Sequence, residues 1–241
     1  MTTTAFVDRY MEPLLSGNRG ACRAVVRDFA TKSDPVSVYH ELIWPAMERV
    51  DKLYRQDQIN RAVEHMATRI NRAIADQLQI NLIPRDPNGR RILITCADGE
   101  PEELGAQMCA DLFESHGWDT YFVGGGIPND EILTLVGQLR PDILLIFGTR
   151  PQGVPGVRAL IDMIREVGSN PTMNIMISGG VFNRAEGLWK EINADLFART
   201  AKEAIPIAET AQPRQAEIKL PGAPKKRRRR RRSAMLAVAE A

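Results

Sequence analysis

The chain has 241 residues, of which 44% are hydrophobic and 26% are charged, and its formal net charge is +2. This composition is typical of a soluble globular protein that is long enough for two modest domains. No apolar run approaches the roughly 18 to 20 residues of a membrane-spanning helix. The N-terminus also lacks the basic residues that precede the apolar core of a leader, so we expect a cytoplasmic protein with no membrane partner.

Positive charge is concentrated near the C-terminus. Lys225 to Arg232 are eight consecutive basic residues, so the rest of the chain is net negative. We therefore expect any non-specific binding of nucleic acid to come from this run alone, with a solvated solubility tail as the alternative.

Residues 1–82 have apolar side chains at helical spacing and contain no convincing strand. The apolar positions define four helices with short connections, which predicts an antiparallel four-helix bundle. Pro45 lies inside the third helix and should kink or split it. Residues 81–91 contain two prolines and a glycine among polar residues, which is typical of a domain linker.

Beyond the linker, strands and helices alternate. We expect strands at 92–96, 120–123, 143–147 and 174–177, with a weak fifth at 195–197, and helices at 105–115, 129–139, 157–167 and 200–209. This pattern predicts an α/β domain at 90–211 with a five-stranded, doubly wound (Rossmann or flavodoxin-like) parallel sheet. Ligands of such sheets lie beyond the carboxyl ends of the strands, where several glycines fall. Residues 212–241 have no core pattern, and we expect them to be disordered.

The segment Glu100 to Gly105 follows the first predicted strand and resembles the cobalt-binding loop of cobalamin (B12)-binding domains. In that family the loop has the pattern Asp-x-His-x-x-Gly, in which the histidine coordinates cobalt and the aspartate orients the imidazole. The chain keeps an acid at Glu100 and the glycine at Gly105, but it has Glu102 at the histidine position. The resemblance implies cobalamin as cofactor, held between a helical cap and a Rossmann-like domain.

Two later loops and the bundle extend the resemblance. Phe147-Gly148-Thr149 lies where the family usually has Ser-x-Leu or Thr beside the nucleotide tail of the cofactor. Ser178-Gly179-Gly180 matches the family's Gly-Gly, whose missing side chains let the tail pass close to the backbone.

In the bundle, Tyr54 stands at the position of a family Trp, and Glu64-His65 matches a Glu-His pair. The resemblance implies that these three residues cover the upper face of the corrin, with His65 as the candidate neighbour of cobalt. Without the resemblance, Tyr54 would be interpreted as a core aromatic and Glu64-His65 as a pair on the helix surface.

The glutamate at position 102 changes what the site is expected to do. Cobalt in cobalamin prefers a nitrogen base, and a carboxylate is a harder ligand that suits its axial position poorly. The loop is therefore not expected to supply a metal ligand. Three states remain open: a corrin that keeps its own benzimidazole, a corrin with no protein ligand below, or a site that no longer binds corrin.

From these features we expect a non-enzymatic sensor or transcription-related regulator that binds cobalamin and acts on a protein partner or a DNA-binding regulator. The alternatives are a corrinoid protein for methyl transfer and a degenerate scaffold without cofactor. No helix-turn-helix precedes the bundle, no Gly-x-Gly-x-x-Gly follows the first strand, and no nucleophile-base-acid set is present. The sequence does not define the oligomeric state.

Overall fold

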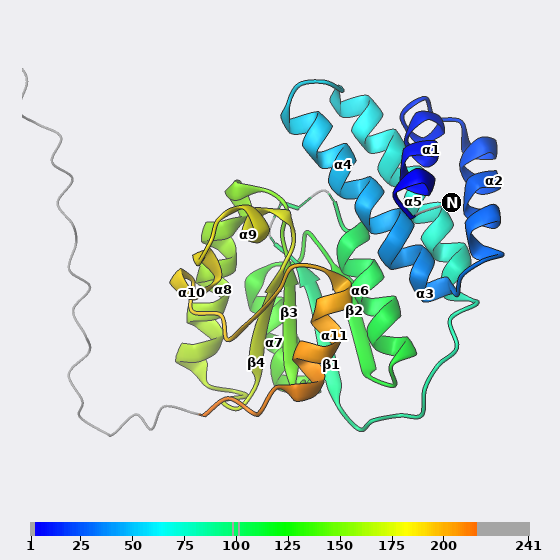
Figure 1. Ribbon diagram of the computed structural model, residues 1–241. Coiled ribbons are helices and arrows are strands. Elements are labelled where there is room, and N and C mark those ends of the chain that lie inside the picture. The colour runs from blue at the N-terminus through cyan, green and yellow to red at the C-terminus, as the bar shows by residue number, and fades with distance from the viewer. Residues whose placement is uncertain (1–2, 98, 101, 216–241) are drawn as a thin grey trace, which may run out of the picture.

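The structure is a computed structural model, and it describes residues 3–97, 99–100 and 102–215. The predicted tail therefore lies almost entirely outside the described residues, together with its basic run from Lys225 to Arg232. The described part divides into N-terminal helices and an α/β domain (Figure 1). None of its helices is long and apolar enough to cross a membrane.

The N-terminal helices form a bundle in which polar residues cap the helix starts. Asn18, Asp34 and Asn60 each accept a hydrogen bond from a backbone N–H in the first turn of the helix that follows, which satisfies a donor that the helix itself leaves unpaired. The elements are α1 (Thr3–Leu15), α2 (Arg19–Ala30), α3 (Pro35–Val38), η1 (Tyr39–Ile43), α4 (Trp44–Arg55) and α5 (Arg61–Gln79).

The predicted third helix runs from α3 to α4 without a break, but its middle is not α-helical. The element η1 is a π-helix, and the N–H of Trp44 reaches back to the carbonyl of Tyr39. Pro45 follows at the start of α4 and has no N–H to donate. The proline thus coincides with a change of helix type instead of a break, because a π segment gives the chain another way to pair the neighbouring backbone groups.

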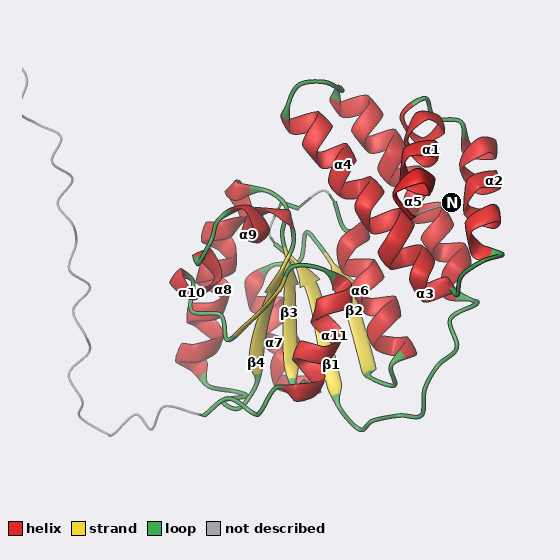
Figure 2. Ribbon diagram, viewed as in Figure 1, coloured by secondary structure: helices red, strands yellow, loops and turns green. Residues whose placement is uncertain are grey.

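The second domain contains a five-stranded parallel sheet in the order β2-β1-β3-β4-β5 (Figure 2). Its strands are β1 (Arg91–Cys96), β2 (Asp119–Gly124), β3 (Ile143–Phe147), β4 (Asn174–Ser178) and β5 (Leu196–Ala198). The helices between them are α6 (Leu104–Ser115), α7 (Asn129–Leu139), α8 (Val154–Val167) and α11 (Ala201–Thr210), with the short α9 (Gly180–Arg184), α10 (Leu188–Glu191) and 3₁₀ turn η2 (Pro151–Gly153). This sheet behind N-terminal helices confirms the predicted fold class.

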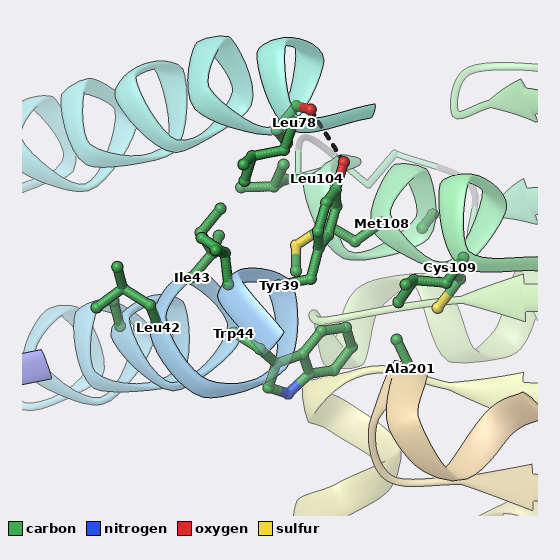
Figure 3. Packing of buried hydrophobic residues seen from close by; sticks show 14 of the residues in the cluster. Tyr39, Leu42, Ile43, Trp44, Leu78, Leu104, Met108, Cys109 and Ala201 are labelled. Carbon is green, nitrogen blue, oxygen red and sulfur yellow. Dashed lines mark hydrogen bonds between the residues drawn. The ribbon is translucent and has the colours of Figure 1, made fainter. Parts of the chain in front are cut away.

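Two hydrophobic clusters lie on opposite faces of the sheet. One contains Leu93 and Leu144 and is covered by α7 and α8. The other contains Ile92 and Ile94 and continues through α6 and α11 into the N-terminal helices. Figure 3 shows bundle residues such as Tyr39, Ile43 and Leu78 facing Leu104 and Met108 of α6. The bundle and the sheet domain therefore share one core, which holds α4 and α5 above the strand ends.

Candidate functional site

The candidate site lies at the carboxyl ends of β1 and β3, which are adjacent in the sheet while their connections run to opposite sides. This is the switch point where ligands of open α/β sheets bind. Three loops meet there: the one after β1 that leads to α6, the one after β3, and the tight turn between β4 and α9. Helices α4 and α5 of the bundle lie over them (Figure 1).

An apolar pocket separates the bundle from the strand ends. Trp44, Met47 and Val50 of α4 form one wall, and Leu104, Met108 and Phe147 form the facing wall. The rings of Trp44 and Phe147 meet edge to face, with centroids 6.4 Å apart. The volume of the pocket is about 110 Å³, below the roughly 300 to 1,000 Å³ of typical small-molecule sites. The two domains are thus closed over the site.

Two carboxyl groups line this apolar pocket, that of the buried Glu64 from α5 and that of the half-buried Glu102 from the loop after β1. Among the described residues neither Glu64 Oε2 nor Glu102 Oε2 has a hydrogen-bond partner. Burial raises the pKa of Glu64, and it raises the pKa of Glu102 to about 7 because the charged forms lose water. His65 Nε2 lies 3.9 Å from Glu102 Oε1. The pocket therefore places carboxyl groups of reduced acidity beside an apolar ligand space.

The other acids of the loop after β1 serve its structure. Glu100 is buried and accepts hydrogen bonds from the N–H of Thr149 at 2.5 Å, from Thr149 Oγ1 at 2.7 Å and from the N–H of Glu102 at 3.2 Å. Glu103 accepts from the N–H of Gly125 at 2.7 Å and lies 3.4 Å from Arg72 of α5. These carboxylates tie the loop to the ends of β2 and β3 and to the bundle.

The glycines at the strand ends allow close contact within the protein. A Cβ atom on Gly105 would lie 2.2 Å from Phe147 Cζ, and one on Gly179 would lie 2.2 Å from the carbonyl oxygen of Gly148. Gly179 also has a φ of +106°, which disfavours other residues. The space that these missing side chains leave is thus filled by the Phe147 ring and by backbone. Beneath it, Ser178 is fully buried, and its Oγ has no partner among the described residues.

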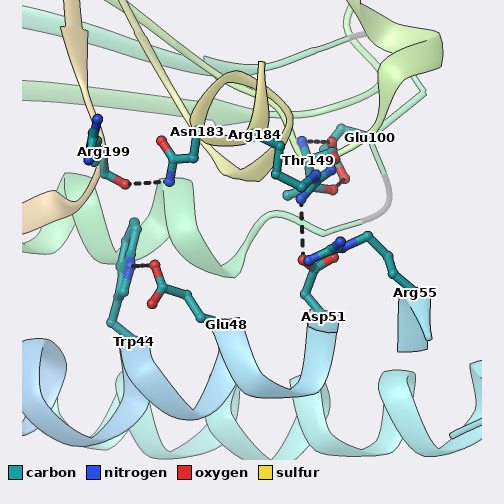
Figure 4. Close-up of polar contacts among 9 residues, drawn as sticks. All are labelled: Trp44, Glu48, Asp51, Arg55, Glu100, Thr149, Asn183, Arg184 and Arg199. Atoms are coloured by element: carbon teal, nitrogen blue, oxygen red, sulfur yellow. Dashed lines mark hydrogen bonds and ion pairs between the residues drawn. The ribbon is translucent and has the colours of Figure 1, made fainter. Parts of the chain in front are cut away.

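A polar cleft adjoins the apolar pocket and contains Arg184 of α9. Its Nη1 atom lies 3.2 Å from Asp51 Oδ2 of α4, and its Nη2 donates to the carbonyl of Thr149 at 2.6 Å. Asp51 also pairs with Arg55 at 2.9 Å (Figure 4). Arg184 therefore links the bundle to two of the loops at the strand ends.

The structure brings most of the predicted residues together, but it distributes them over several surfaces. The apolar pocket is lined by Glu64, Glu102, Gly105, Thr149, Gly179 and Gly180. Gly148 and Ser178 lie buried below it. Glu100 and Tyr54 line the polar cleft, and His65 lines a small cleft with Arg72 on the other side.

The aromatic wall of the apolar pocket is Trp44, whereas the sequence resemblance pointed to Tyr54. Both residues belong to α4, but Tyr54 lies near its C-terminal end, where the helix has passed the pocket and meets the polar cleft. Trp44, Met47 and Met108 were not among the predicted site residues. The spacing of Trp44, Met47 and Val50 on one helical face was the available signal, although it is equally typical of a core.

Comparison with known proteins accounts for this two-part arrangement. Two family models match the chain, each described as a B12 binding domain, one over residues 90–209 and the other over residues 7–79. The chain is 20% identical over 200 residues to dimethylamine corrinoid protein 1 of Methanosarcina acetivorans, covering 81% of this chain and 92% of the relative. It is 18% identical over 213 residues to the dimethylamine corrinoid protein of Methanosarcina barkeri, covering 87% and 98%.

The fold is also that of a solved corrinoid protein. The structure of the monomethylamine corrinoid protein of Methanosarcina barkeri superposes with a TM-score of 0.76 at 15% identity, covering 86% of this chain and 98% of that one. The family matches lie on the bundle and on the sheet domain, the two parts that enclose the pocket. They confirm the predicted resemblance and cofactor: the chain belongs to the B12-binding domain family, and it is a cobalamin-binding protein.

Proposed function

We propose that the protein is a corrinoid protein that carries methyl groups for a methyltransferase partner. The observation that carries the proposal is the similarity to dimethylamine corrinoid proteins over 81% to 87% of this chain, which spans the helical cap as well as the sheet domain. The comparisons thus favour the alternative that the sequence left open over the sensor. Nothing in them supports a transcription-related regulator or a DNA-binding partner.

The chemistry of the upper wall of the pocket suits a corrin. Trp44, Met47 and Val50 present a flat apolar wall that would cover one face of the ring and exclude water. The unpartnered Oε2 of Glu64 is a polar group that a cofactor with amide side chains could satisfy. When bound, the corrin supplies a cobalt centre that takes up and releases a methyl group.

The closed arrangement implies that the bundle moves to admit the corrin, because the pocket is far smaller than the ligand. The polar links that would break are Arg184 with Asp51 and Arg72 with Glu103. Each of these side chains is roughly a third exposed, and such ion pairs contribute about 0 to 1 kcal/mol. Breaking these two ion pairs therefore costs little free energy when the bundle moves away from the strand ends. The same movement would give a partner access to the site.

Cobalamin binding provides the first test. The purified protein is incubated with hydroxocobalamin, and the corrin that it retains after desalting is measured by visible absorption. Trp44→Ala removes the largest apolar surface of the pocket and should weaken binding by about tenfold, since large aromatic contacts contribute 1 kcal/mol or more. Tyr54→Ala is the matched control on the same helix and should leave binding within about threefold. A larger effect of Tyr54→Ala would contradict the placement of the pocket.

Methyl transfer tests the carrier role itself. The protein loaded with methylcobalamin is mixed with a thiol and a corrinoid-dependent methyltransferase, and the loss of the methylcobalamin absorption is followed. We expect the bound methyl group to be consumed faster than that of free methylcobalamin at the same concentration. Stable retention of the methyl group during turnover of the free cofactor would contradict the carrier role, whereas corrin binding would stand.

A further inference from the structure

The side of the pocket that lies towards the sheet does not fit a ligand to cobalt. Glu102 stands where the family has its histidine, and its carboxyl group faces His65 and the apolar space. A carboxylate is a poor axial donor for cobalt in a corrin. His65 belongs to α5 of the bundle, and its Nε2 lies 3.9 Å from Glu102 Oε1, but the side chain lines the small cleft with Arg72 and not the apolar pocket. Among the described residues, the lining of the apolar pocket therefore includes no histidine.

The crevice below Glu102 is filled by an aromatic ring. Phe147 ends β3, only 5% of it is exposed, and its ring lies directly on Gly105 at the start of α6. Trp44 covers the outer edge of the Phe147 ring. Phe147 stands at the position where the resemblance places a small polar serine. A bulky apolar side chain thus occupies the entrance between the loops after β1 and β3.

The deeper part of the crevice is closed by hydrogen-bonded backbone. The N–H of Gly148 donates to the carbonyl of Ser178 at 3.0 Å, and the N–H of Val181 donates to the carbonyl of Gly148 at 3.3 Å. Glu100 binds the N–H and hydroxyl of Thr149. A nucleotide tail that entered between these loops would have to break these contacts and expel the Phe147 ring, and each broken buried hydrogen bond would leave a costly unpaired group.

We infer that this protein binds corrinoids with no protein nitrogen below the cobalt and with the nucleotide tail outside the crevice. The ligand class is therefore wider than complete cobalamins and includes corrinoids that lack the lower nucleotide. Phe147 and Glu102 determine this specificity. The inference rests on the proposed corrin binding. The affinity comparison that follows distinguishes failure of the inference from failure of the proposed function.

The first measurement compares the dissociation constants of cobalamin and cobinamide, which lacks the nucleotide. We expect equal affinities within about threefold, because the tail would contribute no contact in the crevice. If cobinamide binds more than threefold more weakly than cobalamin, the inference is overturned and the proposed function is left intact. Failure of both ligands to bind overturns the proposed function, and the inference with it.

The second measurement looks for a protein nitrogen on cobalt. The protein is labelled with ¹⁵N-histidine and loaded with cob(II)alamin, and the electron paramagnetic resonance spectrum is recorded. We expect no two-line splitting from ¹⁵N in the wild type; a splitting that persists in His65→Ala, which lacks the candidate neighbour of cobalt on the upper face, overturns the inference. Glu102→His/Phe147→Ser, which restores the ligand and empties the crevice, should acquire that splitting and bind cobalamin more tightly than cobinamide. Circular dichroism checks that the variant folds; if it does not, the wild-type spectrum and the affinity ratio still decide.

Discussion

At the scale of single residues, Tyr39 and Asp111 form a buried polar contact between the bundle and the sheet domain. Tyr39 Oη lies 2.9 Å from the carbonyl oxygen of Ala75 and 2.9 Å from Asp111 Oδ2, and all three groups are buried or within helices. A phenol has one hydrogen to donate, so the Tyr39 hydroxyl is shared between these two acceptors. Asp111 belongs to α6, so this contact joins the sheet domain to the bundle.

The burial of Asp111 predicts a fall in stability as the pH rises. Loss of water around its carboxylate, helped by Glu114 and Asp76, outweighs the hydrogen bond from Tyr39 and raises the pKa of Asp111 from 3.8 to about 6. The resulting contribution is complete below pH 3.8 and is lost as the pH rises through about 6, with a total on the order of 3 kcal/mol. Urea unfolding between pH 4 and 7 should show this loss, and Asp111→Asn, whose amide oxygen can still accept from Tyr39, should flatten it. An unchanged pH slope in Asp111→Asn would refute the assignment.

At the scale of elements, the packing of α6 against the end of β3 depends on a glycine in the first turn of the helix, Gly105. The first turn of α6 approaches the end of β3 so closely that Phe147 occupies the place of a side chain on Gly105. This contact positions the loop after β1, which has Glu102 in the pocket wall. The geometry of the site thus follows from the packing of one strand end on one helix start.

Alanine scanning of two helical glycines tests this packing. Gly105→Ala should destabilise the protein by about 1 to 3 kcal/mol, because the new methyl group overlaps the Phe147 ring. Gly137→Ala, in the last turn of α7, is the matched control: a Cβ there meets nothing within 4 Å, so alanine should stabilise the helix by up to about 1 kcal/mol. Chemical unfolding measures both. Equal effects at the two positions would show that Phe147 can move aside at little cost.

At the scale of the whole molecule, the shared core makes the bundle and the sheet domain interdependent. The cluster that contains the bundle residues continues through α6 to the face of β1. Neither part can bury its apolar surface without the other, even though the polar links around the pocket are weak. Opening of the pocket must therefore leave the contact of α5 and η1 with α6 largely in place.

Unfolding followed at two tryptophans checks this coupling. Of the three tryptophans in the chain, Trp44 lies in the bundle, whereas Trp118 and Trp189 belong to the sheet domain. Variants that keep only Trp44 or only Trp118 should have coincident urea transitions, as expected for one cooperative unit. A bundle signal that changes at clearly lower urea than the Trp118 signal would show that the two parts unfold separately.

Most of the fold could be predicted from the sequence because its elements obey simple patterns. The strand Ile143–Phe147 is an unbroken apolar run between a Pro-Asp pair and a glycine, and its bounds agree with the prediction. The helices α9 and α10 are too short to show a period and were missed. The π-helix could not be predicted either, since its residues also suit an α-helix.

The candidate site was less accessible to prediction, because its walls come from segments that only the tertiary structure brings together. The loop motif pointed to Glu102 and Gly105, and both line the apolar pocket. It could not show that Phe147 lies on Gly105 or that α4 turns Trp44 instead of Tyr54 towards the strand ends. The functional prediction likewise depended on one substituted residue, Glu102, whereas the similarity over most of the chain favours a methyl carrier.

The π segment Tyr39–Ile43 makes the length of the long bundle helix adjustable by one residue. A π turn accommodates an extra residue that a regular helix of the same ends would not contain, and each residue rotates the following helix face by about 100°. Deleting one residue here would give an uninterrupted helix but would turn Trp44 and Met47 away from the pocket. The register of a single helical turn thus decides which side chains the bundle offers to the cofactor.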